Sequence, residues 1–136
     1  MIATTINTHT FTNTFTKQDV LSTQQVKRGD IFLADLPDNM GSSVQVGARP
    51  VLVIQNDMGN RHSPTLIVTP LTSRTKNQIP THVDVKKEGG LMKCSTVLCE
   101  QIQTIGKDKL LKYIGRLSQV TMEKITKALT ASIGHN

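Results

Sequence analysis

The chain has 136 residues, the size of a single domain, and its 16 Lys and Arg residues against 10 Asp and Glu residues give a net charge of +6. A basic balance favours polyanionic partners such as nucleic acid or an acidic protein segment. Two cysteines exclude a disulfide-rich scaffold, no apolar run approaches the roughly 18 residues of a membrane span, and three Phe, one Tyr and no Trp argue against a sheet that stacks RNA bases.

The first residues differ in composition from the rest. Residues 1–25 hold eight Thr and only two charged side chains. They lack the basic start and the apolar run of a secretory signal, and we interpret them as a flexible arm. The expected organisation is a Thr-rich arm at 1–25 followed by one folded domain at 26–136.

Strand patterns dominate the first half of that domain. Residues 31–36 predict a strand that Pro37 ends. Residues 38–47, rich in Gly and Ser, predict a mobile loop. The nearly continuous apolar run at 50–54 predicts a strand that is buried on both faces of a sheet.

Loop and strand patterns then alternate along the chain. Residues 55–63 predict a turn, and 65–69 predict the return strand of a hairpin. A polar, basic loop at 73–80 is followed by strand patterns at 82–86 and 95–102.

The end of the chain is predicted to be helical. After a last short strand at 113–117, Ser118 is a suitable N-cap. Apolar residues then recur at spacings of three and four, as on one face of a helix: Met122, Ile125, Leu129 and Ile133. Short strands followed by a closing helix indicate an α+β fold, a small barrel-like sheet with a C-terminal amphipathic helix.

The four His and two Cys residues do not show the spacing of zinc ligands. Cys94 and Cys99 are five positions apart, so on one strand they would point to opposite faces and share neither a metal nor a disulfide. We interpret both as small thiols that fill the core. No cluster of carboxylates offers a magnesium cage either, and we expect no metal and no cofactor.

The spacing of Arg49 and Thr72 suggests chemistry. If 56–63 is the turn of an antiparallel hairpin, the numbers of opposed residues sum to about 119, and Arg49 faces position 70. Thr72 is then its diagonal neighbour, about 7–8 Å away between Cα atoms. An Arg fork beside a hydroxyl suits phosphate oxygens; the alternative, an ordinary surface Arg and a strand-end Thr, stays open.

Several segments resemble the MazF/PemK-type toxin endoribonucleases of type II toxin–antitoxin systems. The resemblance runs in order through residues 26–134, with spacing typical of the family. It rests on 26–31 (VKRGDI), 47–57 (GARPVLVIQND), 63–65 (SPT), 70–73 (PLTS), 80–83 (PTHV), 98–105 (LCEQIQTI) and the terminal helix with Ala128 and Leu129.

This resemblance implies an SH3-like barrel that forms a homodimer, cleaves single-stranded RNA in the cytoplasm without a metal, and is inhibited by an acidic, partly disordered antitoxin. Attack by the RNA 2′-OH would leave a 2′,3′-cyclic phosphate and a 5′-OH. The catalytic positions of the family fall on Arg49, within Gly-x-Arg-Pro, and on Thr72. The Glu-Gln pair that lines the family's RNA groove falls on Glu100 and Gln101, with a solvated strand face as the alternative. Arg74, Lys76 and Lys86 are expected to guide the RNA backbone by their charge. The other expected RNA-binding residues are Ser42, Ser43, Gln45 and Ser73.

One loop departs from the family pattern. Residues 41–47 read GSSVQVG, where relatives often carry an acid in a shorter loop. Because this loop helps to select the RNA sequence that is cut, we do not assign the cleavage motif of the relatives to this chain. His82 is a candidate general base within the matched segments, with a structural strand His as the alternative.

Other functions stay open at this point. A non-catalytic RNA- or DNA-binding barrel explains the charge equally well but has no use for an Arg–Thr pair at one rim. A toxin of the same fold would instead inhibit a protein target such as a topoisomerase, and then Arg49 would be dispensable. An inert relative with a degenerated loop is a third alternative.

Overall fold

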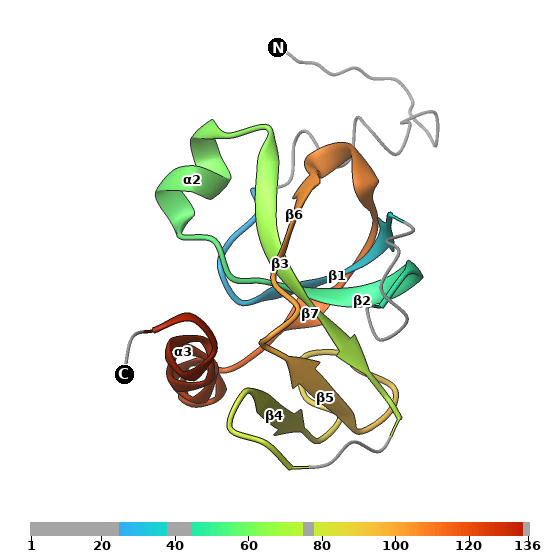
Figure 1. The fold of residues 1–136 in the computed structure, drawn as a ribbon. Coiled ribbons are helices and arrows are strands. Elements are labelled where there is room, and N and C mark those ends of the chain that lie inside the picture. Colours follow the sequence, from blue (N-terminus) through green and yellow to red (C-terminus); the bar gives the residue numbers. More distant parts are fainter. Residues whose placement is uncertain (1–24, 38–44, 75–77, 135–136) are drawn as a thin grey trace.

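The computed structural model describes residues 25–37, 45–74 and 78–134, which form a seven-stranded antiparallel sheet with three helical segments (Figure 1). The strands are β1 (Asp30–Leu36), β2 (Gly47–Val53), β3 (Thr65–Thr72), β4 (His82–Val85), β5 (Ser95–Leu98), β6 (Gln103–Gly106) and β7 (Leu110–Arg116). The helical segments are α2 (Asp57–His62), the 3-10 turn η1 (Lys107–Lys109) and α3 (Gln119–Ile133). The predicted arm up to residue 24 and the predicted loop at 38–44 lie outside the described residues.

Strand β3 lies at the centre of the sheet. The strand order is β4-β5-β3-β2-β1-β7, and β6 pairs with the first half of β3. The end of β3, Leu71 and Thr72, pairs instead with β5. The predicted α+β class with a C-terminal helix is confirmed. The sheet does not close into a barrel, because within the described chain β6 pairs only with β3 and β7 only with β1.

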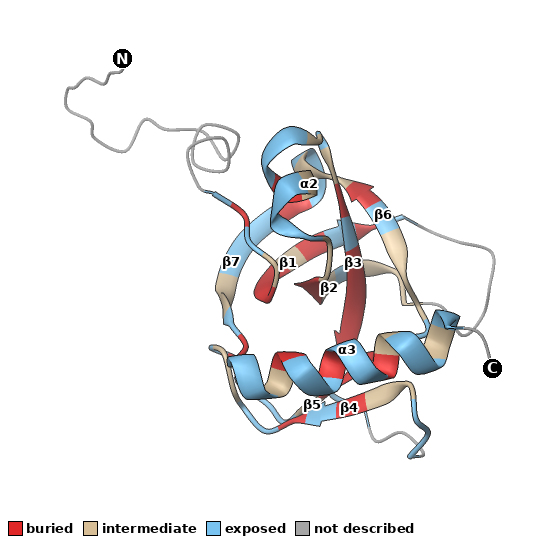
Figure 2. Cartoon of the chain, turned by 90° about the vertical axis from the view of Figure 1, so that its left-hand side faces the viewer, coloured by how far each residue is buried: buried red, intermediate tan, exposed pale blue. Residues whose placement is uncertain are grey.

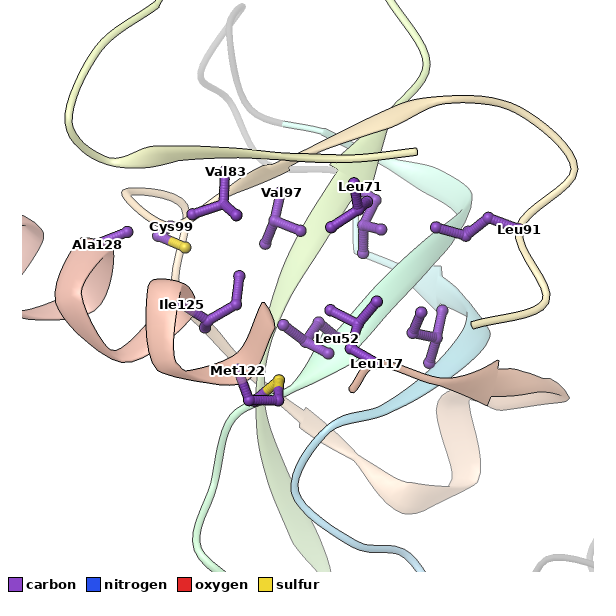
Figure 3. Packing of buried hydrophobic residues seen from close by; sticks show 12 residues of the cluster. Leu52, Leu71, Val83, Leu91, Val97, Cys99, Leu117, Met122, Ile125 and Ala128 are labelled. Atoms are coloured by element: carbon purple, nitrogen blue, oxygen red, sulfur yellow. The ribbon is translucent and has the colours of Figure 1, made fainter. Parts of the chain in front are cut away.

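Buried apolar side chains form two clusters on opposite faces of the sheet. The strand-side cluster includes Val51 and Val53, and the helix-side cluster includes Leu52 between them. All three side chains are fully buried, so the predicted two-faced burial of this run is confirmed. Helix α3 covers the helix-side cluster (Figure 2) and points these residues into it (Figure 3): Met122, Ile125 and Ala128.

The predicted turn at 55–63 and the predicted place of Ile133 on the apolar helix face both need correction. The segment predicted as a turn at 55–63 contains α2, which begins after Asn56, whose side-chain Oδ1 accepts a hydrogen bond of 2.8 Å from Gly59 N–H. Helix α3 does begin after Ser118, whose Oγ accepts from Thr121 N–H. Ile133, predicted to belong to the apolar face, is 74% exposed, because the cluster beneath the helix ends at Leu129.

The β2–β3 hairpin has a different register from the one predicted. Val51 pairs with Pro70, and Val53 pairs with Val68, so opposed numbers sum to 121 rather than 119. The connection is α2 instead of a symmetric turn, which moves the centre of the hairpin by one residue. Among the described helices, none is both long enough and apolar enough to cross a membrane.

The two cysteines are free thiols in different environments. Cys99 is buried in the helix-side cluster, and burial together with the neighbouring Glu100 carboxylate raises the pKa of its thiol to about 12. Cys94 is exposed because it precedes β5 instead of lying on it. The prediction that both thiols fill the core is therefore wrong for Cys94.

Candidate active site

Arg49 on β2 and Thr72 on β3 lie at the same end of two neighbouring strands. The β2–β3 ladder ends at the pair of Val51 and Pro70, and Arg49 and Thr72 each lie two residues beyond this pair. Side chains alternate along a strand, so Arg49 shares the face of Val51. Thr72 shares that face because its neighbour Leu71 belongs to the helix-side cluster on the other one. The predicted pair therefore occupies one face and one end of the sheet.

The Arg49 side chain is half-buried and held by the chain that leads into β2. Its Nε donates a hydrogen bond of 3.2 Å to the carbonyl oxygen of Val46. This bond uses one of the five N–H donors of the guanidinium group. The next residue back, Gln45, donates its backbone N–H to Oε1 of Gln101 over 3.0 Å. The start of β2 is thus tied to the segment between β5 and β6.

Thr72 is buried, with 2% of its surface exposed, and its hydroxyl is oriented by the following turn. Its Oγ1 accepts a hydrogen bond of 3.2 Å from the backbone N–H of Arg74. Because the oxygen acts as the acceptor in this bond, the hydroxyl proton can be donated to another group. Ser73 and Arg74 themselves are exposed.

Glu100 and Gln101 are neighbours in sequence but have different partners. Glu100 Oε2 lies 3.0 Å from His82 Nε2, and Oε1 accepts from the Thr81 hydroxyl over 3.1 Å. Burial opposes the ionisation of Glu100, but hydrogen bonds from His82, from its own backbone and from Thr81 outweigh it and lower the pKa of Glu100. Gln101 bonds to Gln45 instead. The Glu100 carboxylate is therefore bonded to residues at the start of β4, whereas the Gln101 amide is bonded to the segment that leads into β2.

The predicted site residues are thus partly assembled by the fold. Hydrogen bonds connect Gln45 with Gln101 and hold Arg49, while Thr72 and Arg74 share the neighbouring strand end. Ser42, Ser43 and Lys76 lie outside the described residues.

Two residues that the sequence did not single out lie in the same row as Thr72. Thr72 pairs with Thr96 across β3 and β5, and Thr96 pairs with Asp84 across β5 and β4. The Thr96 hydroxyl donates to Asp84 Oδ1 over 3.0 Å. In the sequence, both residues are polar positions within the strand patterns at 82–86 and 95–102. This alone does not place them beside Thr72, because their position depends on the pairing of β5 with the end of β3.

Metal binding is not supported by any cluster within the described ranges, where no three His, Cys, Asp or Glu side chains come together to hold an ion.

Comparison with known proteins identifies relatives of this chain. A family model described as a PemK-like, MazF-like toxin of type II toxin–antitoxin systems matches residues 27–133. An endoribonuclease from a mycobacterial species shares 32% identity and a TM-score of 0.68, over 82% of this chain and 93% of that one. A mycobacterial endoribonuclease in complex with its cognate antitoxin shares 32% identity at a TM-score of 0.67, and the match covers 82% of this chain and 97% of that one. The Mycobacterium tuberculosis toxin MazF-mt6 shares 27% identity with this chain at a TM-score of 0.67, and the match covers 79% of this chain and 98% of that one.

Proposed function

Because the chain belongs to the PemK-like, MazF-like toxin family of type II toxin–antitoxin systems, we propose that it is an endoribonuclease that cuts single-stranded RNA at a preferred sequence. The observation that carries this proposal is the placement of Arg49 and Thr72 on one face of neighbouring strands, each oriented by a backbone group. An Arg fork beside a hydroxyl donor matches the oxygens of a phosphodiester.

The proposed reaction uses the ribose 2′-OH as nucleophile. Its oxygen forms a bond to the adjacent phosphorus while the bond from phosphorus to the 5′-oxygen breaks. The 2′-OH loses its proton and the leaving 5′-oxygen gains one, so the products are a 2′,3′-cyclic phosphate and a 5′-OH. No metal ion takes part in these steps.

Arg49 and Thr72 are assigned to charge stabilisation. Arg49 supplies N–H donors to the phosphorane oxygens, and the Thr72 hydroxyl supplies another. Preorganised donors of this kind each contribute on the order of 10²–10³ in rate. A guanidinium group stays protonated near neutral pH, so we do not assign proton transfer to Arg49. His82 is paired with Glu100, which favours a structural role for it.

The RNA is proposed to run along the residues around this pair. Gln45 and Gln101 offer amide groups to base edges on the β2 side. Ser73 and Arg74 are proposed to contact the RNA backbone beyond Thr72. Ser42, Ser43 and Lys76, which lie outside the described residues, are proposed as further RNA-binding residues. Glu100, held by Thr81 and His82, lines the β4 side of the groove.

The proposed partners are a second copy of the chain and an antitoxin. Pairing two copies would lengthen the short groove that one sheet offers. The net charge of +6 favours an acidic antitoxin segment, and the solved complex of a mycobacterial relative with its cognate antitoxin supports such a partner. We place the protein in the cytoplasm, where its RNA substrate is found.

The test is cleavage of a long single-stranded RNA by the purified protein in the presence of EDTA. We expect discrete fragments with 5′-OH ends, and no fragments with Arg49→Ala. Intact RNA with the wild-type protein would contradict the proposal. Toxicity that survives Arg49→Ala would instead support inhibition of a protein target.

A further inference from the structure

A polar pocket of about 300 Å³ lies beside the Thr72 end of β3. Its lining comes from residues after β3 and from β4, β5 and the residues next to these two strands. Strands β4 and β5 lie at the lower edge of the sheet in Figure 1. The polar side chains that matter here are Ser73, Arg74, Gln78, Asp84, Lys86 and Thr96.

The pocket is connected to the proposed catalytic pair through the strand register. Thr72 pairs with Thr96, and Thr96 pairs with Asp84, so the three residues form one row on one face of β3, β5 and β4. Neighbouring strands are about 4.8 Å apart, which sets Asp84 about 10 Å from Thr72. This distance is short enough for one nucleotide to bind at Thr72 while the next nucleotide of the strand contacts Asp84.

The Asp84 carboxylate is held in a fixed orientation. Its Oδ2 accepts a hydrogen bond of 2.8 Å from Gln78 Nε2, and its Oδ1 accepts from the Thr96 hydroxyl over 3.0 Å. These two hydrogen bonds lower the pKa of Asp84, so it is ionised at neutral pH. Each carboxylate oxygen has a second lone-pair site, so Asp84 can accept further N–H donors.

The charges of the pocket distinguish a base from a phosphate. A carboxylate repels a phosphate group placed directly against it, whereas Arg74 and Lys86 beside it attract the backbone phosphates on either side. A carboxylate accepts hydrogen bonds from the amino group of a base, as in the pairing of Asp with the cytosine amino group. Uracil has the carbonyl oxygen O4 where cytosine has this amino group, and its one edge donor, N3–H, lies between two carbonyl oxygens that a carboxylate repels.

We propose that this pocket binds the base of a nucleotide next to the cleaved bond, and that Asp84 selects a base with an exocyclic amino group over uracil. The inference rests on the proposed function, since it requires RNA as substrate. It assigns a specificity role to Asp84, with Gln78 and Thr96 as positioning residues.

The experiment compares wild-type protein with Asp84→Asn on short RNAs. The wild-type cleavage motif is first obtained by mapping 5′ ends, and each flanking base is then replaced by uracil or by its analogue without the amino group (inosine, purine riboside or pyrimidin-2-one riboside). At one flanking position we expect kcat/KM of the wild type to fall about tenfold when the amino group is removed. With Asp84→Asn the same replacement should change kcat/KM by less than about twofold.

Matched variants separate this role from a structural one. Asp108→Asn makes the same chemical change in η1, next to the end of β6 that pairs with Thr65, the far end of β3 from Thr72. It should keep the wild-type discrimination. Gln78→Ala removes one of the two bonds that orient Asp84 and should give an intermediate loss of discrimination, which keeps the test informative if Asp84→Asn does not fold.

The outcomes distinguish this inference from the proposed function. Equal discrimination by the wild type and Asp84→Asn, or acceptance of uracil at every flanking position, overturns the inference and leaves RNA cleavage in place. If the wild-type protein cuts no RNA, the proposed function fails and the inference fails with it.

Discussion

The backbone N–H of Gln45 donates a hydrogen bond of 3.0 Å to the side-chain oxygen of Gln101, a residue 56 positions further along the chain. This bond connects the start of β2 with the segment between β5 and β6, and Arg49 is bonded to the carbonyl of Val46 immediately after it. The orientation of Arg49 therefore depends on a residue that comes from the other side of β3.

Replacing Gln101 tests this dependence. Gln101→Ala removes the acceptor and should lower kcat/KM for RNA cleavage by about tenfold, since a misplaced donor stabilises the transition state less well. Because Gln101 is only half-buried, Tm should change little. Gln119→Ala, an exposed position at the start of α3, is the control. Unchanged cleavage by Gln101→Ala would show that Arg49 does not need this bond.

The fork of Arg49 should matter more than its charge. Arg49→Lys keeps the charge but cannot donate two parallel hydrogen bonds, so we expect RNA to bind within about threefold of wild type and to be cut about 100-fold more slowly. Filter binding to an RNA with a single 2′-deoxyribose at the cut measures binding without cleavage. Arg61→Lys on α2 is the matched control, and a wild-type rate for Arg49→Lys would remove the role assigned to Arg49.

Thr72 is expected to act through its hydroxyl. Thr72→Val keeps the shape and removes the donor, so single-turnover cleavage should slow by about 10²-fold. Thr72→Ser should recover much of the rate, because Ser can accept from Arg74 N–H and donate its proton in the same way. Equal rates for the Val and Ser variants would contradict this role.

The stability of the protein should depend on Glu88 at acidic pH. Glu88 accepts hydrogen bonds from Ser118 N–H and the Thr121 hydroxyl at the start of α3. Burial opposes its ionisation, but these bonds outweigh it and lower the pKa of Glu88 below its usual value of 4.5. A carboxylate with a lowered pKa stabilises the fold above its unfolded pKa, and this contribution is lost as pH falls through the folded pKa.

Melting curves of Glu88→Gln provide the measurement. At pH 7 the variant should melt about 3 °C below wild type, which corresponds to a loss of about 1 kcal/mol. The difference should shrink below pH 4.5 as the wild-type carboxylate takes up a proton. Glu123→Gln, an exposed carboxylate on α3, should follow wild type throughout. A Glu88→Gln difference that is the same at pH 7 and pH 3 would exclude this origin.

Much of the fold was predictable because local patterns specify local structure. The run at 50–54 and the helix after Ser118 follow from apolar periodicity and a capping hydroxyl. Ile133 shows the limit of periodicity: it continues the helical spacing, but the sheet beneath the helix does not reach it. Helix α2 was missed because its six residues are short and polar, and its signal was the cap at Asn56.

The candidate site was predictable only in part. Both the strand spacing and the resemblance to the family pointed to Arg49 and Thr72 as candidates. The predicted hairpin register was wrong, because the numbers of opposed residues sum to 121 rather than 119. Thr96 and Asp84 come from strands that follow long after β3, so their place beside Thr72 depends on tertiary pairing. Glu100 and Gln101 also have different hydrogen-bond partners, His82 and Gln45, and these partners cannot be read from the local sequence.

The central position of β3 has a consequence for how the protein opens. In the part of the chain that the structure describes, every ladder that joins β4, β5 and β6 to β2, β1 and β7 passes through β3. The β4–β5 hairpin can therefore detach while the β1–β2–β7 half keeps its hydrogen bonds, but β3 cannot be released without separating the two halves. Its amides at 66–69 should be the slowest in the molecule to exchange with deuterated solvent, at the rate of global unfolding, whereas those of β4 exchange through local opening.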